Sequence, residues 1–555
     1  MVSLIINLFL SSIFLSVSGY QLLKIGFIKK NIETAEAGLY GFILLGSLSL
    51  IINFFLPLNK IINTTILLLL LISFFFQNRN DLSKIKEILI VSIKITFIAS
   101  IFISFSKNFD PDAFLYHLPY TNLINDFKIL PGSSLIHYRF GHVSIIQYIN
   151  ALFNNHIFGV NGVTIPTSMV FSFFFLFVAN EINKILKNNN FFTLYNFFII
   201  SSFIFLCLRM NRYSDYGNDH IGTIFFIYFI SIFIKNFNTK DLEIKKYLSL
   251  LATFIFTIKI FYFVPLILCT YLWILKINIK IINVANSICL FLFSFWLIKN
   301  ILISGCAVYP VSFTCIDKLP WYNTENNSFI NAEQISLSSE AWSKNWNTHY
   351  NKQRLVDKDL DKLNSQTEYI TNFFWLNEWL NVHGKFILKK IFPFIIFILL
   401  LYFLNRKKIK KTKIETDNKL YLILFTINFI VLTLWFLKFP IMRYGLAYIF
   451  IQIFLISYIF FKNKYFHNLK IVLLLSLFIL TSKNILKIIN NFDYNIYPET
   501  SKQVRYFDVE KDNFKIYYTE SLCGYNKSPC TNYKPNIDNI DVKDYFIYKF
   551  ISLKN

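Results

Sequence analysis

The chain has 555 residues, of which 55% are hydrophobic, 19% aromatic and only 16% charged. This composition is too apolar for a soluble protein of this length. The formal net charge of +23 suggests a nucleic-acid partner, but most lysines and arginines lie in short loops between apolar segments, as they do in membrane proteins. We therefore predict a polytopic membrane protein that is all-α where it spans the bilayer and that has no nucleic-acid partner.

Apolar windows of roughly 16 to 22 residues recur along the chain, close to the roughly 20 residues that a helix needs to cross a bilayer. They predict about 14 transmembrane helices. The two short windows on either side of Lys259 form either a bent hairpin or one long helix. In chain order the windows are residues 4–22, 39–58, 61–76, 88–105, 163–179, 194–208, 222–234, 247–258, 261–275, 281–303, 386–404, 420–437, 444–461 and 469–480.

Basic residues are concentrated in every second loop, which indicates the orientation of the chain. Positive charge is retained on the cytoplasmic side of a membrane, so these loops are predicted to be cytoplasmic. The alternate loops hold far fewer lysines and arginines and are predicted to be external. The basic loops are residues 24–31, 78–86, 236–246, 405–419 and 462–470.

The windows and loops divide the chain into six parts. Transmembrane helices are predicted in residues 1–106, 163–303 and 386–482. Two large external loops with interfacial helices are predicted in residues 107–162 and 304–385. The first of them carries the candidate active site. Residues 483–555 turn polar and predict a small external cap of mixed structure, with short strands expected at residues 515–520 and 544–550.

Four of the seven cysteines lie in segments predicted to be external. Cys306 and Cys315 flank one short turn, and Cys523 and Cys530 flank another. Two local disulfides are the preferred arrangement in an oxidising compartment, while the other pairings and four free thiols remain open. The remaining three cysteines fall within apolar windows and are expected to fill space between helices.

Residues 108–141, NFDPDAFLYHLPYTNLINDFKILPGSSLIHYRFG, gather acidic, imidazole and guanidinium groups at the end of an apolar window, which indicates a reactive site at the membrane surface. Asp110 and Asp112 are the candidate catalytic residues. An apolar wall raises the pKa of a carboxyl group, which suits a general base that takes a proton from an acceptor hydroxyl near neutral pH. The alternative for Asp112 is helix capping. The candidate substrate-binding residues of this segment are Tyr116, His117, His137 and Arg139.

The loop RMNRYSDYGNDH adds further charged groups on the same side of the membrane. Asp215 and Asp219 are candidate metal ligands, because Mg²⁺ and Mn²⁺ prefer hard oxygen ligands and carboxylates from two loops could share one ion. Arg212 and Arg443 are candidate substrate-binding residues, and for Arg443 the fork of guanidinium donors suits a lipid phosphate. The alternatives are a solvated loop and, for Arg443, interfacial snorkelling.

The second external loop is rich in tryptophan. An indole ring suits either a membrane surface or the face of a sugar ring. Anchoring to the membrane surface is the preferred interpretation here. The residues concerned are Trp321, Trp342, Trp346, Trp375 and Trp379.

Six motifs, DAFLYH, PGSSLIHYRFG, RYSDYGND, ISGCAVYP, MRYG and CGYNKSPCTNY, resemble the motif series of a little-characterised bacterial family of polytopic proteins similar to the GT-C superfamily of polyprenyl-phosphate-dependent glycosyltransferases. The order of features is also similar: an acid in the first large external loop, then interfacial helices, further spans and a small external cap. The resemblance covers most of residues 107–534. It implies that Asp112 is the catalytic acidic residue, with Asp110 beside it.

The resemblance implies an inverting glycosyltransferase of the bacterial cytoplasmic (inner) membrane, with its active site facing the periplasm or exterior. Asp112 would deprotonate the acceptor hydroxyl, and Arg443 or a metal held by Asp215 and Asp219 would balance the charge of the departing lipid phosphate. The partners would be the bilayer, a lipid-linked sugar donor and an envelope glycan, lipid or protein acceptor. A transporter or lipid flippase of envelope glycoconjugates and an inactive scaffold are the open alternatives.

Overall fold

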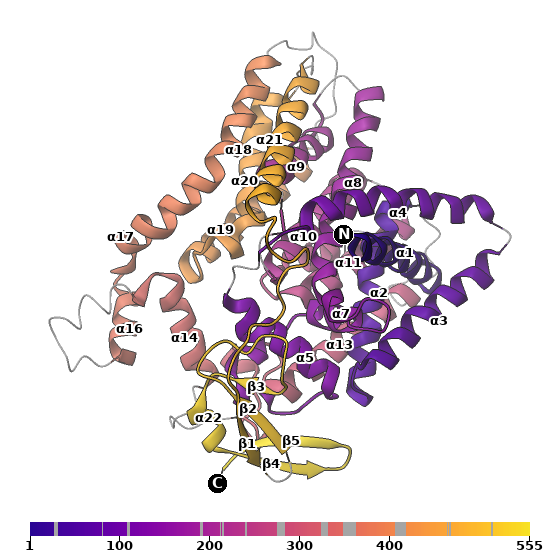
Figure 1. Ribbon diagram of the computed structural model, residues 1–555. Coiled ribbons are helices and arrows are strands. Elements are labelled where there is room, and N and C mark those ends of the chain that lie inside the picture. Colours follow the sequence, from indigo (N-terminus) through magenta and orange to yellow (C-terminus); the bar gives the residue numbers. More distant parts are fainter. Residues whose placement is uncertain are drawn as a thin grey trace.

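The computed structural model describes residues 1–26, 32–79, 81–107, 111–188, 192–210, 212–213, 216–238, 241–274, 283–322, 331–347, 362–405, 418–462, 464, 468–511 and 514–554. These residues are mostly helical, and a small cap of strands lies at one end of the helices (Figure 1). Each predicted apolar window coincides with a helix. We call the end of the molecule that carries the strands the cap end.

The first group of helices is held by close packing near the N-terminus. Helices α1 (Val2–Ile25) and α2 (Thr34–Phe55) approach so closely that a Cβ on Gly41 would lie 2.0 Å from the carbonyl oxygen of Leu15. Small residues allow such approach between membrane helices. The other long helices of this group are α3 (Lys60–Asn78), α4 (Leu82–Ile103), α8 (Ile165–Asn188), α10 (Asn218–Asn236), α11 (Leu242–Ile258), α12 (Val264–Ile274) and α13 (Val284–Ser304).

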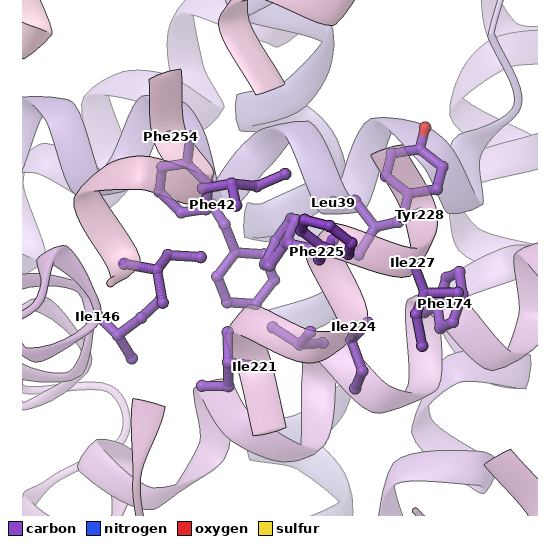
Figure 2. Packing of buried hydrophobic residues seen from close by; sticks show 14 of the residues in the cluster. Leu39, Phe42, Ile146, Phe174, Ile221, Ile224, Phe225, Ile227, Tyr228 and Phe254 are labelled. Atoms are coloured by element: carbon purple, nitrogen blue, oxygen red, sulfur yellow. The ribbon is translucent and has the colours of Figure 1, made fainter. Parts of the chain in front are cut away.

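Helix α10 lies at the centre of this group. All its side chains from Ile221 to Ile234 are buried, as expected for a helix that is apolar on every face. Phe225 contacts rings of α2 and α11 (Figure 2), with ring centroids 6.0 Å from Phe42 and 5.1 Å from Phe254. Helix α10 therefore connects the cap end with the opposite end through the core.

A second group of helices packs beside the first and is drawn mainly in orange in Figure 1. Phe205 of α9 lies against two other helices of this group, with ring centroids 5.7 Å from Phe394 and 4.6 Å from Phe450. Such interlocked rings bury a large apolar area. The helices are α9 (Leu194–Arg209), α18 (Lys385–Leu404), α19 (Asn418–Lys438), α20 (Met442–Phe461) and α21 (Leu469–Asn490).

Nine helices of the described chain are long and apolar enough to cross a membrane, so the prediction of about 14 spans is not confirmed. They are α1, α2, α3, α13, α19, α20, α21 and the segments Val160–Lys187 and Trp375–Leu404, which contain α8 and α18. Helices α4, α9, α10, α11 and α12 fall short in length or composition. In α4 the reason is charge, because Lys84, Lys86, Glu87 and Lys94 lie along it.

Short helices form the cap end between the long ones. After α4 come η1 (Ala113–His117), α5 (Leu118–Asp126), α6 (Ser133–Ile136), η2 (Tyr138–His142), α7 (Ile145–Phe153) and η3 (Val160–Thr164). After α13 come η4 (Ser312–Thr314), α14 (Ala332–Ser343), α16 (Lys362–Thr371), α17 (Trp375–Trp379) and η5 (Leu380–Gly384).

The tryptophans of the second loop are mostly core residues, so the preferred surface role is wrong for four of the five. Trp346, Trp375 and Trp379 form a buried cluster. Trp321 is also buried and donates Nε1 to the carbonyl of a residue in α13 at 2.9 Å. Only Trp342, with 45% of its surface exposed, is available to a ligand or a membrane.

The C-terminal cap has two small sheets. Strands β1 (Phe507–Lys511) and β2 (Phe514–Tyr518) are antiparallel, and β3 (Cys530–Thr531) pairs parallel to β2. After α22 (Lys534–Asp538), strands β4 (Ile540–Tyr545) and β5 (Tyr548–Leu553) form a hairpin. The strand predicted at residues 544–550 is wrong, because the chain reverses there through Phe546, which has φ 53°.

Both predicted disulfides are present in the structure. Cys306 is bonded to Cys315 and Cys523 to Cys530. The second bond closes the loop that packs on η1, where the amide of Gly524 donates to the carbonyl of a residue in η1 at 2.8 Å. The cap is thereby attached to the segment that carries the first predicted site.

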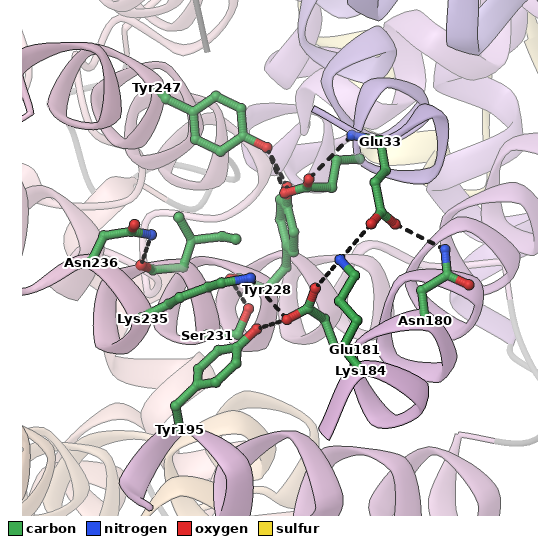
Figure 3. A network of polar contacts seen from close by, with 12 residues as sticks. Glu33, Asn180, Glu181, Lys184, Tyr195, Tyr228, Ser231, Lys235, Asn236 and Tyr247 are labelled. Atoms are coloured by element: carbon green, nitrogen blue, oxygen red, sulfur yellow. Dashed lines mark hydrogen bonds and ion pairs between the residues drawn. The ribbon is translucent and has the colours of Figure 1, made fainter. Parts of the chain in front are cut away.

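A polar network joins helices at the end opposite the cap (Figure 3). We call it the Glu181 network; its residues are Glu33, Asn180, Glu181, Lys184, Tyr195 and Lys235. Glu181 accepts from Lys184 at 2.6 Å, from Lys235 at 2.9 Å and from the hydroxyl of Tyr195. Its carboxylate therefore ties α8, α9 and α10 together.

Candidate functional site

Asp112 stands at the start of a single π-helical turn, η1. It occupies the N-cap position of this turn, yet its side chain makes no capping hydrogen bond. Short π turns are frequent at functional sites. The geometry therefore gives no support to the capping alternative, and the carboxylate of Asp112 is directed to other partners.

Two arginines from distant parts of the sequence hold the Asp112 carboxylate. Arg139 of η2 donates Nη1 to Oδ1, and Arg443 in the first turn of α20 donates Nη1 to Oδ2 at 2.9 Å. Charge-assisted bonds of this kind are the strong ones. The side chain of Asp112 is 15% exposed, so the carboxylate is held in place but remains accessible to a small ligand group.

Asp219 provides a second carboxylate next to the first. Its Oδ1 accepts from Lys259 Nζ, and its Oδ2 lies 3.7 Å from Nε of Arg443, which therefore bridges both acids. Lys259 is brought here by the break between α11 and α12. We call Asp112, Arg139, Asp219, Lys259 and Arg443 the Asp112 site. Among these described residues, three cations face two carboxylates, an excess of one positive charge.

Aromatic rings cover the cations of the Asp112 site. The Arg443 guanidinium lies 5.5 Å from the ring centroid of Trp342 and 5.3 Å from that of Tyr444. The Arg139 guanidinium lies 5.2 Å from the ring of Tyr116. These cation–π contacts orient the charges. The site thus offers both charged groups and aromatic faces to a ligand.

Two histidines of this region, His117 and His137, are buried and neutral. Burial lowers the pKa of His117 to about 4, and its Nδ1 lies 2.5 Å from Nε2 of Gln147. His137 is fully buried, and its Nδ1 accepts the backbone amide of Arg139 at 3.2 Å. Burial lowers the pKa of His137 to about 3. These contacts position η1 and Arg139; they give no support to the predicted contact of His137 with substrate.

The pKa of Asp112 is shifted in the direction opposite to the prediction. Burial acts to raise its pKa, but Arg139 and Arg443 together outweigh burial and hold the pKa below the ordinary value of 3.8. The expectation of a raised pKa was wrong because the two guanidinium groups, which favour the charged form, come from segments that the local sequence does not place there. Asp112 is therefore ionised at neutral pH.

The metal prediction finds little support in the described residues. Asp110 and Asp215 lie outside them. Within the described ranges no group of three or more His, Cys, Asp or Glu side chains could hold a metal ion. Asp219, the described candidate ligand, already faces Lys259 and Arg443, so a divalent cation would meet like charge. The described donor set does not fit such an ion.

One residue of the Asp112 site, Lys259, was not predicted from the sequence, and neither was the contact of Trp342 with Arg443. The predicted residue Arg212 lies outside the site. Lys259 had a signal, because it interrupts two apolar windows, and a lysine in such a position needs a partner. Trp342 was named only as one of several loop tryptophans. Arg212 is exposed and has Lys390 and Lys483 as charged neighbours.

Comparison with known proteins adds a family but no described activity. No curated protein and no solved structure matches the chain. A family model described as "Domain of unknown function (DUF8201)" matches residues 1–450, which include every residue of the Asp112 site and end before the β-rich cap. The chain therefore belongs to the DUF8201 family.

Proposed function

We propose that the chain is a membrane glycosyltransferase that moves a sugar from a polyprenyl-phosphate donor to a cell-envelope acceptor. The observation that carries this proposal is the Asp112 carboxylate, which caps no helix and is held between Arg139 and Arg443. A partly exposed carboxylate fixed by two guanidinium groups, with aromatic faces around it, suits a substrate that carries hydroxyls, a sugar ring and a phosphate.

Asp112 acts as general base in the proposed reaction. The acceptor oxygen bonds to the anomeric carbon, the bond from that carbon to the phosphate oxygen breaks, and the configuration inverts. The hydroxyl becomes strongly acidic as its oxygen forms the new bond, so a carboxylate with a lowered pKa can accept its proton at that stage. Because Asp112 is already ionised, no prior deprotonation is needed.

The leaving phosphate carries negative charge that the site must balance. The positive charge in excess at the Asp112 site attracts such an anion, and Arg443 has donors beyond the two that face carboxylates. Asp219 then acts as a positioning residue: through Lys259 and Arg443 it fixes the cations that receive the phosphate.

The proposed location is the bacterial inner membrane, with the cap end on the periplasmic or exterior side. The two disulfides at the cap end support this orientation, since disulfides persist in oxidising compartments. The basic loops then lie in the cytoplasm.

One observation favours transport as a second candidate. Helix α10 carries ionisable residues at both ends: Asp219 lies in its first turn, and Lys235 in its last turn belongs to the Glu181 network (Figure 3). Transporters use ionisable groups inside membrane helices. A flippase of envelope glycoconjugates would leave the sugar composition of its cargo unchanged and alter only its location.

The experiment compares envelope glycans in cells that lack the gene with cells complemented by the wild-type chain. Mass spectrometry of glycans from the outer surface and from whole cells is the readout. We expect the deletion to remove one sugar from an envelope glycan that is otherwise exported. An intact glycan retained inside the cell would support transport and contradict the proposal.

A further inference from the structure

A second group of cations lies where α9 and α21 end. Arg209, Arg212 and Lys390 lie close enough to Lys483 for their charges to repel it, and Arg212 acts in the same way on Lys487. We call these five residues, which come from α9, the loop after it, α18 and α21, the Arg212 cluster. None of the five belongs to the Asp112 site.

Two members of the Arg212 cluster have a structural role. Lys483 donates Nζ to the carbonyl of Leu208 at 3.0 Å, and Lys487 donates to the carbonyls of Ile101 and Phe102, each at 2.9 Å. These carbonyls belong to the last turns of α9 and α4, where a cation is favourable. The two lysines therefore satisfy helix ends.

The helix ends do not explain the other charges. Arg212 and Lys390 are exposed and add positive charge beside two lysines that already satisfy the carbonyls. In the described part of the chain, no carboxylate lies within ion-pair distance of Arg212, Lys390 or Lys483. Like charges that lie close together destabilise a fold. Charges that are retained at a cost in stability are typical of ligand sites.

The surface next to the cluster is apolar and exposed. On α18, Phe386 is 46% exposed and lies one helical turn from Lys390, whose Nζ is 5.3 Å from the centroid of its ring. On α21, Leu486 is 57% exposed and lies one helical turn from Lys483. A ligand that contacts both features has an anionic head and an apolar tail.

We propose that the Arg212 cluster binds the phosphate or pyrophosphate group of a membrane lipid, with the lipid chain lying along α18 and α21. The cluster supplies guanidinium and ammonium donors that suit phosphate oxygens. This inference stands on the geometry of the cluster and is independent of sugar transfer at Asp112.

Binding to the purified full-length chain in a neutral detergent tests the proposal. The probes are farnesyl pyrophosphate, dioctanoyl phosphatidic acid, inorganic pyrophosphate and, as uncharged reference, farnesol. We expect the two phosphorylated lipids to bind, farnesol to bind at least tenfold more weakly, and salt to weaken the lipid binding. Inorganic pyrophosphate that binds as tightly as the lipids would overturn a lipid site in favour of a soluble phosphate.

The double variant Arg212→Gln, Lys390→Gln separates a site from a general charge effect. Its matched control is Lys419→Gln, Lys470→Gln. These exposed lysines lie in the first turns of α19 and α21, away from the cluster, and their removal takes away the same amount of charge. We expect the double variant to lose at least tenfold in affinity for the phosphorylated lipids, and the control to stay within about twofold.

Thermal unfolding without ligand distinguishes a binding role from a structural one. Because Arg212 and Lys390 repel their neighbours, their removal is expected to leave the melting temperature unchanged or to raise it. A lowered melting temperature with unchanged lipid affinity would overturn the proposal. Equal loss of affinity in the double variant and the control would overturn it too, as would the absence of lipid binding by the wild-type chain.

Discussion

Carboxylates and cations gather at both ends of α10, in the Glu181 network and in the Asp112 site, but the two groups differ in burial and in charge balance. At the end opposite the cap, the Glu181 carboxylate accepts from three donors and its side chain is only 5% exposed. About 24 Å away at 1.5 Å per residue, Asp219 shares the Asp112 site, where both acids keep 15% to 19% exposure. A saturated, buried acid fastens helices, whereas partly exposed acids among excess cations are available to a ligand.

The largest expected effect comes from Asp112→Asn. The amide keeps the shape of the side chain and accepts a hydrogen bond, but it cannot take a proton, so we expect the transfer rate to fall by about 10²- to 10⁴-fold. Stability should fall by no more than about 2 kcal/mol, since no helix cap is lost. Initial rates and thermal unfolding of the purified chain measure the two quantities. A large loss of stability with an unchanged transfer rate would show that Asp112 has a structural role like that of Glu181.

The corresponding change at the opposite end is Glu181→Gln. We expect a loss of about 1–3 kcal/mol in unfolding free energy, because Lys235 and Tyr195 lose their charged acceptor while the lysines remain partly solvated. The transfer rate per folded molecule should not change. Glu243→Gln is the matched control, since Glu243 belongs to a local pair with Lys246 and its loss should cost less than about 0.5 kcal/mol. Equal effects of the two variants would contradict the assigned role of Glu181.

Acid pH provides a sharper test of the cap end. The pKa of Asp112 is depressed, so its charge stabilises the fold above the ordinary value of 3.8, and this contribution is lost as the pH falls through the lowered pKa. Arg139→Gln removes one cause of the depression. We therefore expect the acid-side loss of transfer activity to move to higher pH in this variant. An unshifted profile of kcat/KM would show that Asp112 does not control it.

The smallest expected effect concerns the aromatic cover of the Asp112 site. Trp342→Ala removes an exposed ring over Arg443, and an exposed cation–π contact contributes about 0.5–1 kcal/mol. We expect KM to rise about two- to fivefold with little change in stability, and Trp342→Phe to recover part of the loss. The control is Phe313→Ala, at an exposed ring in η4. The same rise in KM for both would argue against a specific contact.

Helices were the most predictable part of the fold. Apolar windows mark them directly, and each window became a helix, although several proved too short or too charged to meet the criteria for a span. Local thiol spacing likewise indicated both disulfides. The hairpin at Phe546 was missed because an apolar aromatic segment carries no turn residue to announce a reversal.

The site was predictable as a set of residues but not as a set of contacts. Asp112, Arg139, Asp219 and Arg443 were all named from charged motifs next to apolar windows. The pairing of Asp112 with Arg443 spans 331 positions and depends on how α20 packs, which no local pattern specifies. For the same reason the predicted direction of the pKa shift at Asp112 was wrong, and Lys259 was not predicted to be a site residue.

Envelope glycans of cells that carry Asp112→Asn or Glu181→Gln on the chromosome test the central claim most directly. The membrane level of each variant is matched by immunoblotting before the glycans are compared by mass spectrometry. We predict that Asp112→Asn reproduces the loss of one sugar that we expect on gene deletion and that Glu181→Gln leaves the glycan complete. A complete glycan in the Asp112→Asn cells would contradict the assignment of sugar transfer to this carboxylate.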